Sequence, residues 1–251
     1  MKKIDRTGEV INNTRGIPMK IIEYKNANEI IVEFQDEYKA KIIGNYRNFK
    51  KGLIKNPYDK IIFDIGYIGV GEYKSRIEGD ATICYRIWRD MLERCYNPYY
   101  LNKYPTYINC FVCEEWHCFQ NFAEWFYKRY YEIPNERMCL DKDILIKNNK
   151  LYSPSTCCIV PEKINLLFVK NDISRGDLPI GVTFYKNKYT SQCSCNHKQN
   201  YLGRFNDIRS AWLMYKINKE LVIQSIANEY KDKIPQYVYE AMMDYRVEYD
   251  D

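Results

Sequence analysis

The stretch MCLDKDILIKNNKLYSPSTCCIVPEKINLLF, residues 138–168, decides how the middle of this chain is expected to fold. Its first apolar run ends at Asp141 and is followed by turn residues at 148–149. A second apolar run, 157–160, leads into Pro161, a residue that favours the first turn of a helix. The pattern predicts two antiparallel strands followed by a helix, a ββα unit.

Two helices with aromatic residues are predicted before this unit. The first runs from about Asp80 to Asn97, and its apolar stripe consists of Cys84, Ile87, Trp88, Met91 and Cys95. The second runs over about 114–131, with the stripe Trp116, Phe119, Phe122, Phe126 and Tyr130. Because the aromatic residues keep helical spacing, we expect them in a core rather than stacked on nucleic-acid bases.

Short apolar runs broken by turn residues fill the N-terminal part, from Gly8 to about Tyr73. Residues 19–24 and 29–34 predict a β-hairpin, and further strands are expected at 39–46 and 61–68, giving a small β-barrel-like sheet. The basic segment 45–52 is expected to be a solvated loop or, alternatively, a phosphate contact. The glycines of 66–71 suggest a linker.

The C-terminal part predicts a three-stranded antiparallel sheet, with strands at 181–186, 188–195 and 200–205. Asn206 and Asp207 are expected to cap a helix whose apolar stripe is Ile208, Ala211, Trp212 and Tyr215. Two more helices, near 220–230 and 235–246, are expected to cover the same core.

Together these patterns predict an α+β chain of three modules. They are a small β domain at 1–73, a helical and ββα domain at 74–172, and a three-stranded sheet packed on helices at 173–251. The hydrophobic fraction is 46% and the charged fraction 28%, values typical of a globular protein. No apolar run approaches the roughly 20 residues that a membrane span needs, and the start is not that of a secretory signal. We therefore expect a cytoplasmic protein with reduced thiols.

The central region, from about Tyr85 to Phe168, resembles the HNH-like proteins common in bacteriophages. The residues that carry the resemblance are Cys113 to Trp116, Phe119, Phe122, Trp125, Leu140 to Lys142, Tyr152 to Pro154 and Cys157. The resemblance implies a homing-type endonuclease that hydrolyses duplex DNA with Mg²⁺ or Mn²⁺. By alignment, Asp141 matches the metal-binding acid and Asn165 the helix ligand.

The sequence departs from the HNH pattern at Lys142, which stands where the general-base histidine is expected. A protonated lysine is a poor general base unless burial lowers its pKa, so Lys142 would instead neutralise the phosphate and leave the acid role to Asp143 or to a metal-bound hydroxide. Alternatively, Asp141 and Asp143 only cap a turn in a degenerate unit. Cys110 and Cys113 form a CxxC pair, but the second pair of a zinc site is missing, and no structural zinc is expected.

The last region resembles the Apetala-type DNA-binding domain of plant ethylene-response factors, which is also found in phage HNH proteins. The residues that carry this resemblance are Gly181, Val182, Lys188, Tyr189, Leu202 to Phe205, Ala211 and Trp212. In that family the sheet enters the major groove and its outward side chains contact bases and phosphates, and the matching positions are Thr183, Tyr185, Gln192, Ser194, Gln199 and Tyr201. Several of these positions are arginine in the plant proteins, so a GC-rich target read in the plant manner is not expected, whereas Gln192 suits adenine. The local excess of positive charge separately favours phosphate contacts from Lys186, Lys188, Lys198 and Arg204, with Arg175 just before them.

Three functions follow from these patterns. The first is a metal-dependent endonuclease, and the second is a catalytically dead DNA-binding protein derived from one, which regulates genes or inhibits a host protein. The third is a purely structural or protein-binding role. The net charge of +5 favours none of them strongly, because such an excess also occurs in proteins that never bind nucleic acid.

Overall fold

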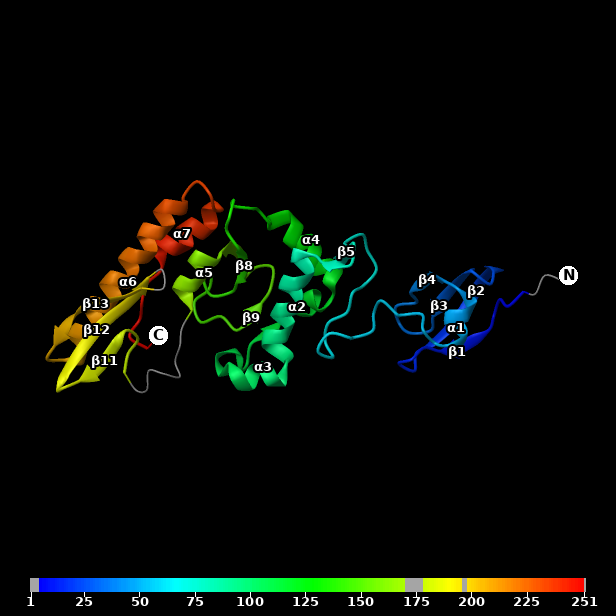
Figure 1. Ribbon diagram of the computed structural model, residues 1–251, viewed down its shortest axis with the longest axis horizontal. Helices are drawn as coiled ribbons and strands as arrows, with labels where there is room; N and C mark the ends of the chain where they lie inside the picture. The colour runs from blue at the N-terminus through cyan, green and yellow to red at the C-terminus, as the bar shows by residue number, and fades with distance from the viewer. Residues whose placement is uncertain (1–4, 170–177, 196–197, 251) are drawn as a thin grey trace. The chain divides into compact units, whose positions relative to one another are not determined.

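The computed structural model describes residues 5–169, 178–195 and 198–250, without the side chains of Cys195, Lys198 and Gln199 (Figure 1). The chain divides into two compact units. One is formed by residues 1–100 and 112–127, and the other by residues 101–111 and 128–251. Each unit combines helices with antiparallel strands, which confirms the α+β class. The division cuts through the module predicted at 74–172, so the boundaries of the three modules stay a prediction.

The first unit begins with a four-stranded antiparallel sheet in sequence order (Figure 1). Its strands are β1 Val10–Asn12, β2 Pro18–Asn26, β3 Glu29–Phe34 and β4 Lys41–Gly44. The β2–β3 hairpin is the one predicted, and the side chain of Asn26 accepts the N–H groups of Asn28 and Glu29 in its turn. Alternate residues of both strands are buried, as a sheet with one covered face requires. β1 and β4 are its two edges, so the pairing describes an open sheet.

Two expectations for this region are wrong. The basic segment is not a loop but contains helix α1, Tyr46–Lys50, because Asn45 caps its first turn and Phe49 anchors it in the core. The strand expected at 61–68 is replaced by a turn, since Phe63 and Asp64 adopt left-handed conformations at φ 51° and 57°. The segment keeps only isolated bridges.

The helical part of the first unit follows a short hairpin of β5 Arg76–Ile77 and β6 Asp80–Ala81. Thr82 caps α2, Ile83–Tyr96, and buried Cys84, Trp88, Met91 and Cys95 confirm most of its predicted stripe. The connection to the next long helix, of which residues 101–111 belong to the second unit, contains α3 Pro98–Lys103, a 3₁₀ turn η1 Pro105–Tyr107 and β7 Phe111–Val112. The glycines expected as a linker are packed instead, since a Cβ at Gly66 would meet Leu92 and Trp88.

The second predicted aromatic helix is split in two. It forms a 3₁₀ turn, η2 Glu114–His117, and helix α4, Phe119–Arg129. The break lies at Cys118, whose backbone is extended because it bridges Tyr67, a residue far away in the sequence. Tyr67 accepts the N–H of Phe119 at 2.9 Å and donates its own N–H to the carbonyl of His117 at 3.0 Å. A non-local contact therefore overrides the helical periodicity.

The second unit contains the strands and helix expected over 138–168. They are β8 Met138–Asp141, β9 Leu151–Tyr152, β10 Cys158–Pro161 and α5 Glu162–Phe168. β8 and β10 pair antiparallel, with Asp141 opposite Cys158. The N–H of Phe111 bonds to the carbonyl of Lys150, which joins β7 to β9.

The C-terminal sheet consists of β11 Val182–Tyr185, β12 Lys188–Cys195 and β13 Lys198–Phe205, in that order, and it packs on the long helix α6, Ile208–Tyr230 (Figure 1). Asp207 caps α6, as expected, by accepting the N–H of Ser210 at 2.8 Å. The separate helix predicted at 220–230 is wrong, because residues 216–219 contain no helix breaker and α6 continues through them. α7, Gln236–Asp244, is the last helix of the described chain.

The expectation that the last helices cover the core of the C-terminal sheet is wrong. Helix α7 and the second half of α6 instead cover the core of the central strands. One hydrophobic cluster joins Val160, Ile164, Ile226, Val238 and Met242. A separate small cluster of Cys193, Tyr215 and Val247 lies under the sheet. α6 therefore belongs to two cores, with its first half on the sheet and its second half on β10 and α5.

Candidate functional site

The two faces of the C-terminal sheet differ because opposite residues on paired strands share a face. Val182 lies opposite Ser191, which lies opposite Gly203, and this row faces α6, since Val182 and Ser191 are buried. The next row, Thr183, Thr190 and Arg204, must therefore point to the other side. We call that side the outer face.

The outer face is open to solvent among the described residues. Tyr185 is 62% exposed and Tyr201 is 63% exposed, although aromatic side chains usually bury much of their surface. The residues that the pairing assigns to this face are Thr183, Tyr185, Lys188, Thr190, Gln192, Ser194, Tyr201 and Arg204. A hydrogen bond of 3.1 Å from Nε2 of Gln192 to Oγ1 of Thr183 spans two strands on this face.

A β-bulge sets the pattern of the third strand. The register shifts after Ser191, so that Gln192 pairs with Tyr201 and leaves Leu202 as the extra residue. Leu202 packs with the cluster of Cys193 and Tyr215, while Tyr201 stays outside. The bulge thus allows one strand to pack Leu202 against the cluster and to expose Tyr201 on the outer face.

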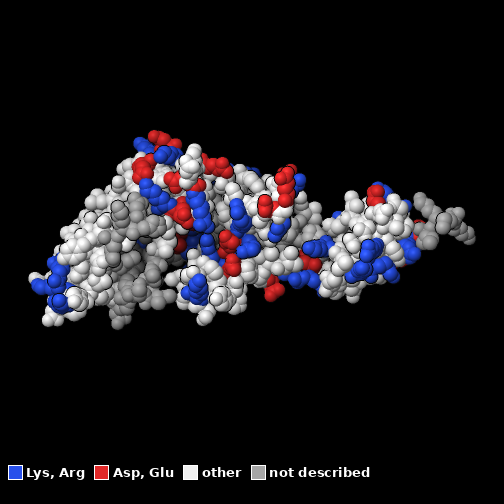
Figure 2. Space-filling model, viewed as in Figure 1, with Lys and Arg blue, Asp and Glu red and all other residues white. Residues whose placement is uncertain are grey.

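Basic side chains gather at one end of the sheet. Lys186 and Asn187 form a two-residue turn between β11 and β12, with φ of 48° and 57°, the values of a type I′ hairpin turn. Arg204 donates to the carbonyl oxygen of Tyr185 at 3.2 Å, and Lys188 donates to the side chain of Asn206. Figure 2 shows Lys and Arg side chains gathered at this end of the sheet, with no acidic side chain beside them on the face in view.

The predicted DNA-contacting residues come together as a group on the outer face and its turn, as far as their side chains are described. Ser194 lies opposite Gln199, but the side chains of Gln199 and Lys198 are outside the described part of the chain, as is Arg175. Thr190 is an outer-face residue that sequence reasoning missed. The alternation of Lys188, Thr190 and Gln192 was the signal that would have found it.

Asp141 ends strand β8 with a buried carboxylate. Its Oδ1 accepts the N–H groups of Asp143 and Ile144, both at 2.8 Å. Burial, together with the nearby charge of Asp143, raises the pKa of Asp141 to about 6. The carboxylate therefore caps the turn after β8. Turn capping was the alternative to metal binding that the sequence suggested for Asp141.

Lys142 closes the loop between β8 and β9. Its ammonium group, largely buried, donates to both carboxylate oxygens of Asp143 at 2.8 Å and to the carbonyl oxygen of Asn149 at 2.7 Å. The side chain of Asn149 donates in return to the carbonyl oxygens of Lys142 at 2.9 Å and Leu151 at 2.6 Å. These bonds connect the two ends of the loop.

The residues of this loop do not fit a divalent metal ion in the arrangement found. Oδ1 of Asp141 and both oxygens of Asp143 already accept hydrogen bonds, and Asp143 faces the ammonium group of Lys142. Asn165 lies half-buried on α5, and no hydrogen bond joins it to Asp141 in the described part of the chain. Mg²⁺ prefers carboxylate and water oxygens in an octahedral shell, which these occupied groups do not offer.

No group of three or more His, Cys, Asp or Glu side chains is placed to hold a metal ion among the described residues. The nine cysteines whose side chains are described form no disulfide with one another. Burial raises the pKa of Cys157 to about 12 and that of Cys110 above its usual value, which keeps both protonated at neutral pH.

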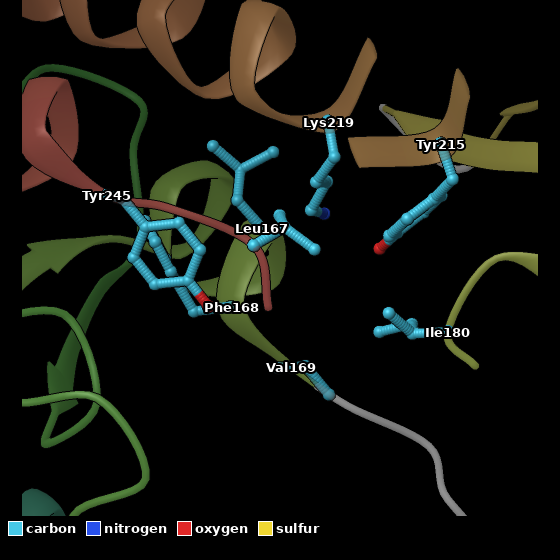
Figure 3. A pocket seen from close by; sticks show the side chains of 8 residues that line it. Leu167, Phe168, Val169, Ile180, Tyr215, Lys219 and Tyr245 are labelled. Carbon is cyan, nitrogen blue, oxygen red and sulfur yellow. The ribbon is translucent and has the colours of Figure 1, made fainter. Parts of the chain in front are cut away.

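A hollow in the second unit lies apart from all the predicted site residues. It is lined by α5, α6 and the segment after α7, and Figure 3 shows Lys219 and Tyr215 reaching toward Leu167 and Ile180. Its walls are mainly apolar.

Comparisons of the chain with protein-family models, with curated proteins and with solved structures find no match. In the described residues, no helix is both long enough and apolar enough to cross a membrane. The candidate sites therefore rest on their own geometry.

Proposed function

We propose that this chain binds duplex DNA by inserting the outer face of the sheet β11–β13 into the major groove. The observation that carries the proposal is the division of this face into two parts. Its centre holds hydrogen-bonding side chains that include Gln192 and Thr183, and its end holds the cations Lys186, Lys188 and Arg204. Phosphate contacts position a protein on DNA, and base contacts specify the sequence, so both kinds of group are available.

The arrangement of the sheet agrees with this proposal. Helix α6 covers only one face of the sheet, which leaves the outer face available to approach the base edges in the major groove. The resemblance to Apetala-type domains supports the same orientation. The proposal thus makes the chain a DNA-binding protein of the kind found in phage HNH proteins.

The experiment measures binding of a labelled duplex by fluorescence anisotropy over a range of salt concentrations. We expect the logarithm of the affinity to fall linearly with the logarithm of salt concentration. The double variant Lys186→Ala, Lys188→Ala should lower the slope by about 2 and weaken binding roughly tenfold or more at 0.1 M salt, because each phosphate contact contributes about 0.9 to the slope.

The double variant Lys231→Ala, Lys233→Ala is the matched control. It removes the same charge from exposed residues that follow α6, away from the sheet. The proposal expects the wild-type slope for this control. Equal losses in both double variants would mean that only net charge matters, and no binding by the wild type at 50 mM salt would overturn the proposal.

Hydrolysis of the bound DNA, as a homing-type endonuclease, is the second candidate function. The observation that favours it is the pair of neighbouring carboxylates, Asp141 and Asp143, with the pKa of Asp141 raised to about 6. Such perturbed acids are common where acid–base chemistry occurs. A divalent ion at Asp141 and Asn165 would have to displace the bonds that Asp141 now accepts and compete with Lys142 for Asp143.

Incubation of supercoiled plasmid with Mg²⁺ or Mn²⁺ tests the second candidate. Nicking that disappears in Asp141→Asn, while DNA binding is kept, would support hydrolysis. Intact plasmid under both metals, from protein that binds the same DNA, would exclude hydrolysis and leave a DNA-binding protein without catalysis.

A further inference from the structure

The amide of Gln192 is held in one orientation at the centre of the outer face. Its Nε2 donates to Oγ1 of Thr183 at 3.1 Å, although the two residues lie on adjacent strands and in neighbouring rows. Tyr201 lies directly opposite Gln192 on the third strand. The amide is therefore bound on the β11 side and has an exposed aromatic ring on the β13 side.

This bond leaves a defined set of hydrogen-bonding groups on Gln192. A glutamine amide has two N–H donors and one carbonyl oxygen, and Thr183 takes one donor. The second N–H and Oε1 make no other hydrogen bond in the described part of the protein. When Thr183 takes the N–H that points away from Oε1, the free N–H and Oε1 lie side by side on the planar amide. Adenine offers the complementary pair in the major groove, an acceptor at N7 and a donor at N6.

We propose that Gln192, oriented by Thr183, reads an adenine in the major groove and gives the protein a preference for an A·T pair at one position of its target. This inference rests on the proposed DNA-binding function. Guanine presents acceptors at both N7 and O6, so Oε1 of Gln192 would face an acceptor without a hydrogen between them. The amide that pairs with adenine therefore binds guanine less well at the same position.

The charges around Gln192 agree with this selectivity. The outer-face neighbours whose side chains are described are neutral: Thr183, Thr190, Ser194 and Tyr201. The nearest cation assigned to the face, Arg204, lies opposite Thr190 and bonds to the carbonyl oxygen of Tyr185. Arginine is the usual partner of guanine, and at this central position none of the described side chains can serve in that role.

Selection of binding duplexes from a library with a randomised central segment tests the inference. The wild type should enrich adenine at one position, by roughly 5- to 150-fold over guanine, the range that one bidentate contact gives. Gln192→Ala should lose the enrichment at that position alone. Replacing the selected adenine by 7-deazaadenine, which lacks the N7 acceptor, should weaken wild-type binding and leave Gln192→Ala unaffected.

Two further variants separate orientation from the contact itself. Thr183→Val keeps the shape of the side chain but removes the acceptor, so the adenine preference should fall. Thr106→Val, the same substitution at an exposed residue outside the sheet, should keep both the preference and the affinity for unselected DNA. Failure to bind any duplex would overturn the proposed function, whereas binding without an adenine preference, or a preference that survives in Gln192→Ala, would overturn only this inference.

Discussion

Lys142 donates hydrogen bonds to both carboxylate oxygens of Asp143, its neighbour in the sequence, at 2.8 Å each. A third bond, of 2.7 Å, reaches the carbonyl oxygen of Asn149 at the far end of the loop. Lys142 therefore bridges the two ends of its own loop. Its ammonium group is oriented by three acceptors, which suits a structural role better than proton transfer.

Replacing Lys142 by methionine should destabilise the second unit. The substitution keeps most of the apolar stem but leaves the carbonyl of Asn149 and the carboxylate of Asp143 without their donor. We expect a loss of about 1–3 kcal/mol in the free energy of unfolding, measured by urea denaturation. Lys163→Met, which removes a more exposed ion pair with Glu229, should cost about 1 kcal/mol or less. Equal losses in the two variants would contradict the bridging role.

Asp141→Asn should stabilise the protein at neutral pH. Burial raises the pKa of Asp141 from 3.8 to about 6, so the folded state binds this proton more tightly than the unfolded state. The cost of burying the charge is fully present above about pH 6 and disappears as the pH falls below about 4. At pH 7 the variant should therefore gain up to about 3 kcal/mol, since one pKa unit corresponds to about 1.4 kcal/mol.

Urea denaturation of both proteins at several pH values between 4 and 8 checks this prediction. The advantage of Asp141→Asn should shrink steadily from pH 6 to pH 4, because the wild-type carboxyl group becomes neutral over that range. An advantage that does not change with pH would show that the carboxylate is not destabilised by its surroundings.

Local patterns predicted much of the outer face. Alternation along β12 separates Ser191 and Cys193, which are buried, from Gln192 and Ser194, and the sequence alone shows this period of two. The bulge at Leu202 was not predictable in the same way. The bulge depends on whether Leu202 or Tyr201 packs against the cluster around Tyr215. Contacts between residues that are distant in the sequence determine which of the two does so.

Non-local contacts explain the errors elsewhere. The sequence around Cys118 has helical spacing, yet the bridge to Tyr67 extends its backbone and divides the helix. The loop at Asp141 was foreseen as a site and also as a capped turn, but its closure by Lys142 and Asn149 was not. Nothing in the order of these residues shows that the loop brings its two ends together.

Lys186→Asn should stabilise the sheet and weaken DNA binding at the same time. Lys186 adopts φ of 48° in a type I′ turn, a conformation that asparagine tolerates better than lysine. We expect a gain of roughly 0.5–1 kcal/mol in the free energy of unfolding, the usual size of such backbone effects. The lost cation should reduce the salt slope of DNA binding by about 1.

Lys188→Asn provides the comparison, because Lys188 lies in strand β12 rather than in the turn. It should weaken DNA binding similarly without any gain in stability. Thermal unfolding and fluorescence anisotropy of both variants measure the two effects separately. A stabilised Lys188→Asn, or an unchanged salt slope in Lys186→Asn, would contradict the assignment of the turn.

Gly181→Ala should destabilise the protein more than a glycine-to-alanine substitution that causes backbone strain alone. Gly181 has φ of 79°, and a Cβ there would lie 2.0 Å from the ring of Tyr215, which is buried under the sheet. Backbone strain and overpacking together should cost about 2–4 kcal/mol, measured by urea denaturation. Gly79→Ala, at φ of 95° with nothing within 4 Å, should show only the strain, about 1 kcal/mol. If Tyr215→Leu restores much of the loss in Gly181→Ala, the ring is the cause; equal costs at both glycines would mean that Tyr215 does not lie against Gly181 in solution.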